Sequence, residues 1–478
     1  MQKRYTNIWT VVLMAGLLPA CRKFVQVSPP STTLVSTDVY TSDPSASTAM
    51  LGLYNIISAQ GRFATSFDMY AGLEADELTN YNPGNPIFQE FYTNSLMSKN
   101  APFWSELYND VFIANSILQG VEGAKSLSLA VKSQLTGEAS FMRAFFYFYL
   151  VNLWGPVPLA TSASDYQANN AAVRAGKDSV YALIEQDLLV AKSLLSPVFV
   201  GADSKTASTE RTRPTKWAAG ALLARVYLFE GKWAQSELEA DSVLANTGMF
   251  LLLSDLTQVF LANSNEAIWQ LQPVTPDYNT IQANSYILTS DPGTGIAYAT
   301  MSDKLYNAFD SADQRLAIWV GTYTDGAQSW HFPYKYQVNT GASGLSEYLM
   351  VLRLSEQYLI RAEARAEQNK IDGAGGAVGD LNVVRARAGL AGYPVGLSQS
   401  AVLQAVMLER QKELFSEWGH RWMDLVRTGQ VDTVLGPPEN YLQVKGGVTW
   451  NADFSLYPLP LSDLLIDGNM AQNPGYAQ

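Results

Sequence analysis

The hydrophobic positions of the chain recur mainly at helical spacing. Thr215 follows a proline and can cap a helix, so a helix is predicted to begin there. Apolar residues then return every three or four positions until Gly231, at Ala219, Leu222, Leu223, Val226 and Phe229. A second helix is predicted from Trp233 to Ala245 after a short turn. The pattern therefore predicts a pair of helices joined at Gly231.

The alternation of small and large residues in this pair is typical of a degenerate tetratricopeptide repeat. It reads Ala224, Tyr227, Gly231, Trp233, Ser236 and Ala240. Related pairs are predicted around residues 138–153 and 352–368. The second carries a narrow stripe suited to close helix packing, formed by Leu352, Ser355, Leu359, Ala362 and Ala366. These segments predict a mostly α fold with a scaffold of tetratricopeptide-like helix pairs.

Three long stretches interrupt the helical pattern, at residues 79–100, 274–300 and 321–345. They are rich in Gly, Pro, Asn and Thr and carry scattered aromatic residues, which is too much irregular chain for a plain helical solenoid. Long loops in a compact protein usually carry function. The sequence therefore predicts a loop-rich, irregular portion that binds a ligand.

The N-terminus has the features of an exported lipoprotein. Lys3 and Arg4 precede an apolar run from Ile8 to Ala20, which falls short of the roughly 20 residues that cross a membrane but suits a signal peptide. Leu18-Pro19-Ala20-Cys21 resembles the bacterial lipobox, whose cysteine is diacylated and becomes the mature N-terminus. We predict a signal peptide over residues 1–20, with Cys21 as the lipid anchor. A Ser, Thr and Pro-rich tether over residues 21–45 and a folded domain over 46–478 follow.

Composition excludes several kinds of site. Cys21 is the single cysteine of the chain, so its acylation would leave no thiol for disulfides, zinc or nucleophilic catalysis. The two histidines, His331 and His420, are far apart in the sequence, and no metal or cofactor is expected. The glycine-rich run at residues 373–379 has Val378 where a dinucleotide loop needs glycine, and no strand precedes it. We interpret this run as a turn between helices.

The charge of the chain argues against nucleic acid as a partner. The net charge is −12, and loss of the signal peptide removes two basic residues and no acidic ones. Such a chain repels phosphate backbones, and no basic cluster offsets this.

Acidic residues at helical spacing raise the alternative of a lipid-anchored glycoside hydrolase. Glu356 and Glu363 share a helix face about 10.5 Å apart along the axis, slightly more than the roughly 6.5–9.5 Å typical of inverting glycosidases. Basic residues within helical reach, Arg353, Arg361 and Arg365, would keep these carboxylates ionised. Glu409, Glu413 and Glu417 line another helix, and Asp424 lies three residues from both Arg421 and Arg427. We interpret these residues as ion-pair networks between packed helices.

The aromatic residues fall into two groups. Those at helical spacing are interpreted as core residues: Tyr147, Trp154, Trp217, Tyr227, Trp233, Trp418 and Trp422. Those in the three long stretches are candidates for stacking on the C–H faces of a sugar: Tyr81, Phe88, Tyr278, Tyr298, Tyr323 and Trp330. Polar residues that could bind hydroxyl groups interleave with these rings: Asn80, Asn82, Asn85, Asp277, Asn279 and Gln282. Alternatively, the rings only pin the loops to the body of the protein.

We predict that the ligand-binding residues lie on an exposed arc formed by the three long stretches. The candidates are Tyr81, Asn82, Phe88, Tyr278, Asn279 and Trp330.

Several segments, taken in order over essentially the whole chain, resemble the SusD/RagB family of outer-membrane nutrient-binding lipoproteins. They are "CRKFVQVSPP" from Cys21, "GLYNIIS" from Gly52, "FWSELYNDVFIANSIL" from Phe103, "GEASFMRAFFYFYLVNLWGPVPL" from Gly137, "RPTKWAAGALLARVYL" from Arg213, "VLRLSEQYLIRAEARAE" from Val351, "LNVVRARAGL" from Leu381, "LERQKELFSEWGHRWMDLVRTG" from Leu408, "YPLP" from Tyr457 and "QNPGY" from Gln472.

The resemblance implies a non-catalytic bacterial protein with four tetratricopeptide-like helix pairs and an irregular ligand-binding portion. It also implies a place at the outer membrane, where such proteins cap a SusC-like TonB-dependent transporter and hand it glycans or other nutrients. Arg22 and Lys23 follow the cysteine, whereas many surface-exported lipoproteins carry acidic residues there. A lipid-anchored, surface-exposed position is predicted, and these two basic residues make the inner face of the outer membrane the alternative. A scaffold of helical repeats that binds only protein remains the further alternative.

Overall fold

The structure is a computed structural model that describes residues 39–165, 169, 172–295, 297–339, 344–373, 375–466 and 469–476. The predicted signal peptide, Cys21 and most of the predicted tether lie outside the described residues. The first described helix is α3 (Asp43–Ile57), which Ser42 caps and which has a proline in its first turn. The predicted boundary between tether and domain, at residues 45 and 46, therefore falls inside this helix.

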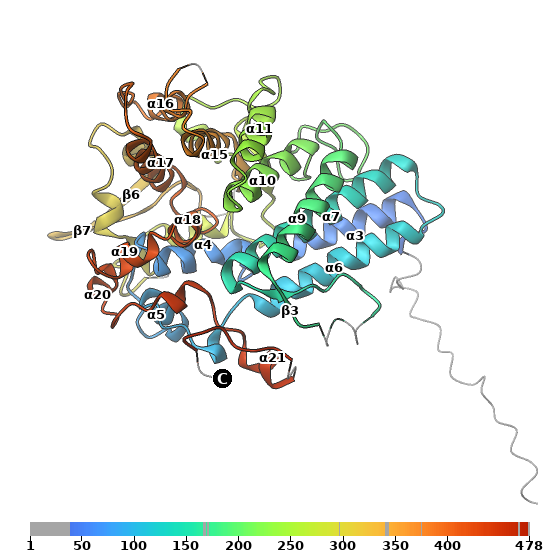
Figure 1. The fold of residues 1–478 in the computed structure, drawn as a ribbon, viewed down its shortest axis with the longest axis horizontal. Helices are drawn as coiled ribbons and strands as arrows, with labels where there is room; N and C mark the ends of the chain where they lie inside the picture. Colours follow the sequence, from blue (N-terminus) through green and yellow to red (C-terminus); the bar gives the residue numbers. More distant parts are fainter. Residues whose placement is uncertain are drawn as a thin grey trace, which may run out of the picture.

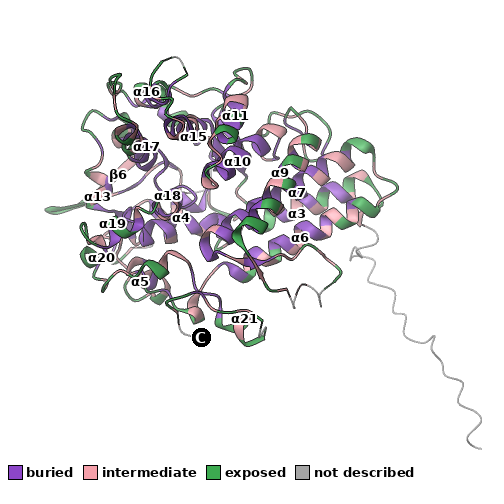
Figure 2. Ribbon diagram, viewed as in Figure 1, coloured by how far each residue is buried: buried purple, intermediate pink, exposed green. Residues whose placement is uncertain are grey.

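Four long helices lie side by side at the N-terminal end of the fold (Figure 1). They are α3, α6 (Trp104–Gly123), α7 (Leu129–Trp154) and α9 (Lys177–Leu194). The C-terminal half of α7 is apolar on nearly all sides, since its neighbours cover it all round, and it is drawn almost wholly as buried in Figure 2. Helix α7 includes the predicted 138–153 segment. Because it is buried, it forms the centre of the core.

The helix pair predicted at Gly231 is confirmed. It consists of α10 (Lys216–Phe229) and α11 (Trp233–Leu244). The hydroxyl group of Thr215 accepts a hydrogen bond from the backbone N–H of Trp217, so Thr215 is the N-cap. Gly231 has a φ of +71°, a left-handed conformation in which a side chain would be strained.

A second group of helices continues the repeat-like packing: α15 (Leu354–Glu367), α16 (Ala377–Arg387), α17 (Gln399–Leu414) and α18 (His420–Arg427). Helix α15 packs against α11, α16 and α17, and its stripe of small residues is buried as predicted. Leu352 was predicted on this helix but lies in the preceding strand, where its side chain is equally buried. The mostly α, tetratricopeptide-like fold is therefore confirmed.

The strands in the described part of the chain form antiparallel pairs. These are β1 (Leu78–Asn80) with β5 (Ala299–Met301), β2 (Val157–Pro158) with β3 (Arg174–Ala175), β4 (Ala267–Leu271) with β8 (Leu349–Arg353), and β6 (Val320–Asp325) with β7 (Gln328–Pro333). The remaining short helices are α4 (Phe63–Glu74), α5 (Pro86–Tyr92), η1 (Ser98–Asn100), η2 (Leu256–Gln258), α12 (Ile281–Tyr286), α13 (Asp303–Tyr306), α14 (Gln314–Ile318), α19 (Val431–Leu435), α20 (Tyr441–Val444), η3 (Ala452–Ser455) and α21 (Leu461–Ile466). Among the described helices, none is both long and apolar enough to cross a bilayer.

The three stretches predicted to be irregular contain more regular structure than expected. The clearest difference is at residues 321–345, most of which form the β6–β7 hairpin. Gly326 lies at the first position of the two-residue turn with a φ of +60°, which suits the right-handed twist of paired strands. The prediction of a loop here was wrong, because a two-residue turn that begins with glycine, between two short runs of strand-forming residues, specifies a hairpin.

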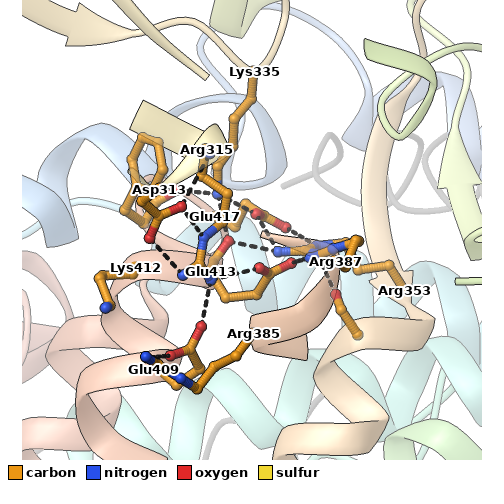
Figure 3. A network of polar contacts seen from close by, with 12 residues as sticks. Asp313, Arg315, Lys335, Arg353, Arg385, Arg387, Glu409, Lys412, Glu413 and Glu417 are labelled. Carbon is orange, nitrogen blue, oxygen red and sulfur yellow. Dashed lines mark hydrogen bonds and ion pairs between the residues drawn. The ribbon is translucent and has the colours of Figure 1, made fainter. Parts of the chain in front are cut away.

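The predicted ion-pair networks between packed helices are present. Helix α17 contributes a buried network in which the carboxylate of Glu413 pairs with Arg315, Arg353 and Arg387 (Figure 3). Burial alone would raise the pKa of Glu413, but the three guanidinium groups outweigh it and hold this pKa well below its usual range. The network fixes α17 to three segments that are distant in the sequence.

The partners that helical spacing placed within reach of Glu356 and Glu363 are not the observed ones. Glu356 pairs with Arg225 on α10, and Glu363 pairs with Arg427 on α18. The arginines of α15 itself reach outward, as when Arg361 pairs with Asp380 on α16. The acids on α15 face neighbouring helices and are buried, so their counter-charges come from those neighbours.

Candidate ligand-binding cleft

A cleft of about 210 Å³ opens between α4 and α12, beside α5 and the residue that precedes β5. Three aromatic rings line it: Tyr70 of α4, Phe88 of α5 and Tyr298. The centroids of Tyr70 and Phe88 lie 5.2 Å apart and those of Phe88 and Tyr298 lie 5.8 Å apart, with the rings tilted by 64° and 50°. All three rings are half-buried, so each residue keeps part of its surface accessible.

Both ends of α4 are held by charged side chains from distant elements. At its N-terminus the backbone N–H of Phe63 donates to the carboxylate of Glu106 on α6, at 2.5 Å. At its C-terminus the buried ammonium group of Lys445 donates to the carbonyl oxygens of Leu73, Glu74 and Ala75, at 2.8 to 3.0 Å. Each charge complements the helix dipole at its end. These contacts fix the wall of the cleft.

The ring of Phe88 is positioned by the start of α5. The carboxamide oxygen of Asn85 accepts hydrogen bonds from the backbone N–H groups of Ile87 and Phe88, and Pro86 begins the helix. Asn85 was proposed to interleave with the rings as a sugar-binding residue, but its side-chain oxygen serves as this N-cap. The ring of Tyr298 comes next to Phe88 because β5 pairs with β1. The backbone N–H of Tyr81 extends this pairing by donating to the carbonyl oxygen of Tyr298, at 2.7 Å.

Neutral polar groups complete the lining of the cleft. Ser66 and Tyr70 lie one helical turn apart on α4, and Asn284 and Ser285 project from α12. Gln60, which is exposed, lies at the rim. Amides and hydroxyls beside aromatic faces can bind the hydroxyl groups of a polyol while the rings contact its C–H faces.

One carboxyl group, that of Asp68, lies at the floor of the cleft. Its side chain is buried and accepts a hydrogen bond from the hydroxyl group of Tyr286, at 3.1 Å. Burial raises the pKa of Asp68 to about 7, although hydrogen bonds from Met69, Tyr286 and Gln282 partly offset this effect. Its charge therefore changes near neutral pH.

The predicted candidates are only partly brought together. Phe88 lies in the cleft. Tyr278 lines a smaller hollow of about 10 Å³ that shares Thr65, Ile281 and Gln282 with the cleft. Tyr278 is half-buried.

Tyr81 and Trp330 belong to a separate hydrophobic cluster with Leu288, Ala297 and Phe332. Trp330 is only 7% exposed, so the prediction that it stands on an exposed arc was wrong. It lies on the inward side of β7, where the alternation of the strand directs it to this cluster. Tyr81 is half-buried at the edge of the cluster.

Asn279 is fully buried, which also contradicts its predicted place on an exposed surface. Its carboxamide oxygen accepts hydrogen bonds from the backbone N–H groups of Ser346 and Glu347, and its amide donates to the carbonyl oxygen of Gly344. Asn279 thus holds the 344–347 segment against the start of α12. Asn82 is half-buried, and its backbone N–H donates to the side chain of Asn80.

The α4 wall of the cleft was missed by the sequence reasoning. Ser66, Asp68 and Tyr70 lie within "FATSFDMYAGLE", which was assigned no role. A signal was present, because polar residues and a tyrosine alternate there with the core residues Phe67 and Ala71. Within the described residues, no group of three or more His, Cys, Asp or Glu side chains could hold a metal ion.

Comparison with known families finds two matching segments. Residues 49–228 match a family described as "Starch-binding associating with outer membrane", and residues 320–476 match one described as "SusD family". A similar protein is SusD-like protein P2 of Formosa agariphila, which is 29% identical over 420 residues that cover 78% of this chain and 80% of that protein.

Solved structures share the fold. A SusD superfamily protein from Bacteroides vulgatus has a TM-score of 0.76 and 21% identity, over 91% of this chain and 99% of that chain. A laminarin-binding SusD-like protein has a TM-score of 0.74 and 23% identity, over 91% of this chain and 100% of that chain.

Proposed function

Because the chain belongs to the SusD/RagB family, we propose that it is a non-catalytic glycan-binding lipoprotein of the outer membrane. It captures an oligosaccharide in the cleft between α4 and α12 and delivers it to a SusC-like TonB-dependent transporter. The observation that carries the proposal is the convergence of Tyr70, Phe88 and Tyr298 beside neutral amides and hydroxyls. The family description as starch-binding and the fold shared with a laminarin-binding protein support a glycan as ligand.

The chemistry of the lining favours binding over hydrolysis. A glycosidase generally needs two carboxyl groups that flank the scissile bond. Among the described residues that line the cleft, Asp68 is the only carboxylic acid. Glu356 and Glu363, which sequence spacing suggested as a catalytic pair, are buried in ion pairs between helices and do not line the cleft.

Delivery to a transporter sets the expected affinity. Cargo that must pass onward should dissociate quickly, so a dissociation constant in the millimolar to micromolar range is expected, about −4 to −8 kcal/mol. Anchoring through Cys21 would hold the domain at the membrane beside its partner. Affinity purification of the tagged protein from its native membranes should recover a TonB-dependent transporter, and a Cys21→Ser variant tests whether the anchor is needed for this.

A glycan array probed with the purified mature protein tests the function. Binding to a defined set of oligosaccharides, without their hydrolysis, is expected. Release of shortened oligosaccharides would support the hydrolase alternative. Absence of binding to any glycan, together with recovery of the transporter, would favour a scaffold that binds only protein.

A further inference from the structure

We infer that Asp68 makes the cleft selective for uncharged glycans and excludes anionic ones such as uronates and sulfated sugars. This inference rests on the proposed function and adds the substrate class and the residue that determines it. Asp68 supplies the single charged side chain among the described residues that line the cleft. The rest of the lining offers rings, amides, hydroxyls and aliphatic groups.

No cation in the described structure compensates Asp68 from the ligand side. The nearest basic residue in sequence, Arg62, directs its guanidinium group to Glu106 and Asp110 of α6, at 3.1 and 2.7 Å. Lysine and arginine are the residues that bind carboxylates and sulfates most strongly, and neither contributes to the lining. An anionic sugar would therefore enter without a partner for its charge.

The groups that face Asp68 from the other side are neutral or acidic. Helix α12 supplies Tyr286 and Gln282, and Tyr336 and Glu417 line the small cavity behind the carboxyl group. Glu77, which follows α4, is buried as well. Burial, then Asp68 and then Glu77 raise the pKa of Tyr286.

The buried lysines around α4 are engaged elsewhere. Lys445 donates to the carbonyl oxygens at the C-terminus of α4 and to the side-chain oxygen of Asn94. Lys335 donates to the carboxylate of Glu417, at 2.5 Å, and to the carbonyl oxygens of Glu413 and Phe415. No ion pair within the described residues involves Asp68, so no basic side chain neutralises its charge beside the cleft.

The size of this effect follows from the dielectric constant near a protein surface. Two like charges about 10 Å apart at an effective dielectric constant of about 20 weaken binding roughly ten-fold. The net charge of −12 acts in the same direction, but it is distributed over the surface and is screened by salt. Selectivity that survives at high salt is therefore assigned to Asp68.

The protonation state of Asp68 provides a second test of its role. Because burial raises the pKa of Asp68 to about 7, its carboxyl group is mostly neutral near pH 5.5 and mostly ionised near pH 8.5. A uronate remains ionised throughout this range. Discrimination against a uronate should therefore increase as the pH rises, whereas the charge of a neutral sugar does not change.

The test uses one bound oligosaccharide in two forms, the neutral sugar and the same sugar oxidised at C6 to the uronate. Calorimetric titration at high salt and pH 8.5 should show that the wild-type protein binds the neutral form with roughly ten-fold higher affinity than the uronate. Asp68→Asn keeps the shape of the side chain and should reduce this preference to about two-fold or less. Asp325→Asn, which removes an exposed charge at the tip of the β6–β7 hairpin, is the matched control and should preserve it.

The outcomes separate this inference from the proposed function. Equal or tighter binding of the uronate by the wild-type protein would overturn the role of Asp68 while leaving glycan binding intact. Failure of the neutral oligosaccharide to bind would instead contradict the proposed function. If Asp68→Asn does not fold, the preference of the wild-type protein for the neutral sugar over the uronate is compared at pH 5.5 and 8.5. An increase of this preference with pH supports the role of Asp68, and a constant preference contradicts it.

Discussion

The carboxylate of Glu356 on α15 accepts two hydrogen bonds, each 2.7 Å long, from the guanidinium group of Arg225 on α10. Both side chains are buried, at 1% and 2% side-chain exposure. Removal of one partner would leave the other charge buried and uncompensated. Glu356→Gln is therefore expected to lower the free energy of unfolding by about 3–5 kcal/mol, measured by denaturant unfolding followed by circular dichroism.

An exposed pair provides the control for this prediction. Glu185→Gln removes a partner of Lys232, whose side chain is 36% exposed, and should cost about 1 kcal/mol or less. Neither Glu356 nor Glu185 lines the cleft, so both folded variants should keep the glycan affinity of the wild-type protein. Loss of affinity in Glu356→Gln at unchanged stability would show that this acid has a functional role.

The ion-pair network on α17 should make stability depend on pH. Three arginines hold the pKa of Glu413 well below its usual range, so the folded state binds fewer protons than the unfolded state. The resulting stabilisation is present above the unfolded pKa of about 4.5 and is lost as the pH falls further. Glu413→Gln should destabilise the protein by about 3–5 kcal/mol at pH 7, and the difference from the wild type should shrink toward pH 3.

Denaturant unfolding of both proteins between pH 3 and 7 checks this. A difference that stays constant over the whole range would mean that ionisation of Glu413 does not contribute.

The helical scaffold could be predicted from the sequence because its signals are local. The cap at Thr215, the turn at Gly231 and the apolar spacing between them lie within one short segment. Ion-pair partners were predicted less well, since Glu356 pairs with a residue 131 positions away. Sequence spacing shows which charges share a helix face, but tertiary packing decides which helix that face meets.

The candidate site could be predicted only in part, because tertiary packing also decides which aromatic residues meet. Aromatic residues in polar segments mark both binding surfaces and small hydrophobic clusters, and the pattern does not separate Phe88 from Trp330. Tyr70 could not be assigned, because the pairing of β1 with β5 and the packing of α12 on α4 bring it into the cleft. These contacts join segments that are more than 200 residues apart.

The buried position of Trp330 predicts a structural role. Trp330→Ala should lower the free energy of unfolding by about 3–5 kcal/mol, because it leaves a cavity among Leu288, Ala297 and Phe332. Trp330→Phe should cost less, since the indole N–H has no hydrogen-bond partner among the described residues. Thermal unfolding together with glycan titration at low temperature checks both variants. A loss of affinity in Trp330→Phe at unchanged stability would place the ligand at this tryptophan instead.

Anchoring through Cys21 can be tested independently of the ligand. Cys21→Ser should release the protein from membranes, because acyl chains supply about 0.8 kcal/mol per buried methylene and the variant has none. Metabolic palmitate labelling with membrane fractionation measures this. An unlabelled wild-type protein, or a variant that stays with the membrane, would contradict the prediction.

The most direct test of ligand binding in the α4–α12 cleft is calorimetric titration of one neutral oligosaccharide into the wild-type protein, Phe88→Ala and Phe112→Ala. Phe112 is a half-buried ring on α6 that does not line the cleft, so it serves as the matched control. Loss of one stacked ring, worth about 1–2 kcal/mol, should weaken binding by Phe88→Ala several-fold to tens-fold, while Phe112→Ala keeps the wild-type affinity. Equal affinities for Phe88→Ala and the wild-type protein, with both folded, would contradict the assignment of this cleft as the glycan site.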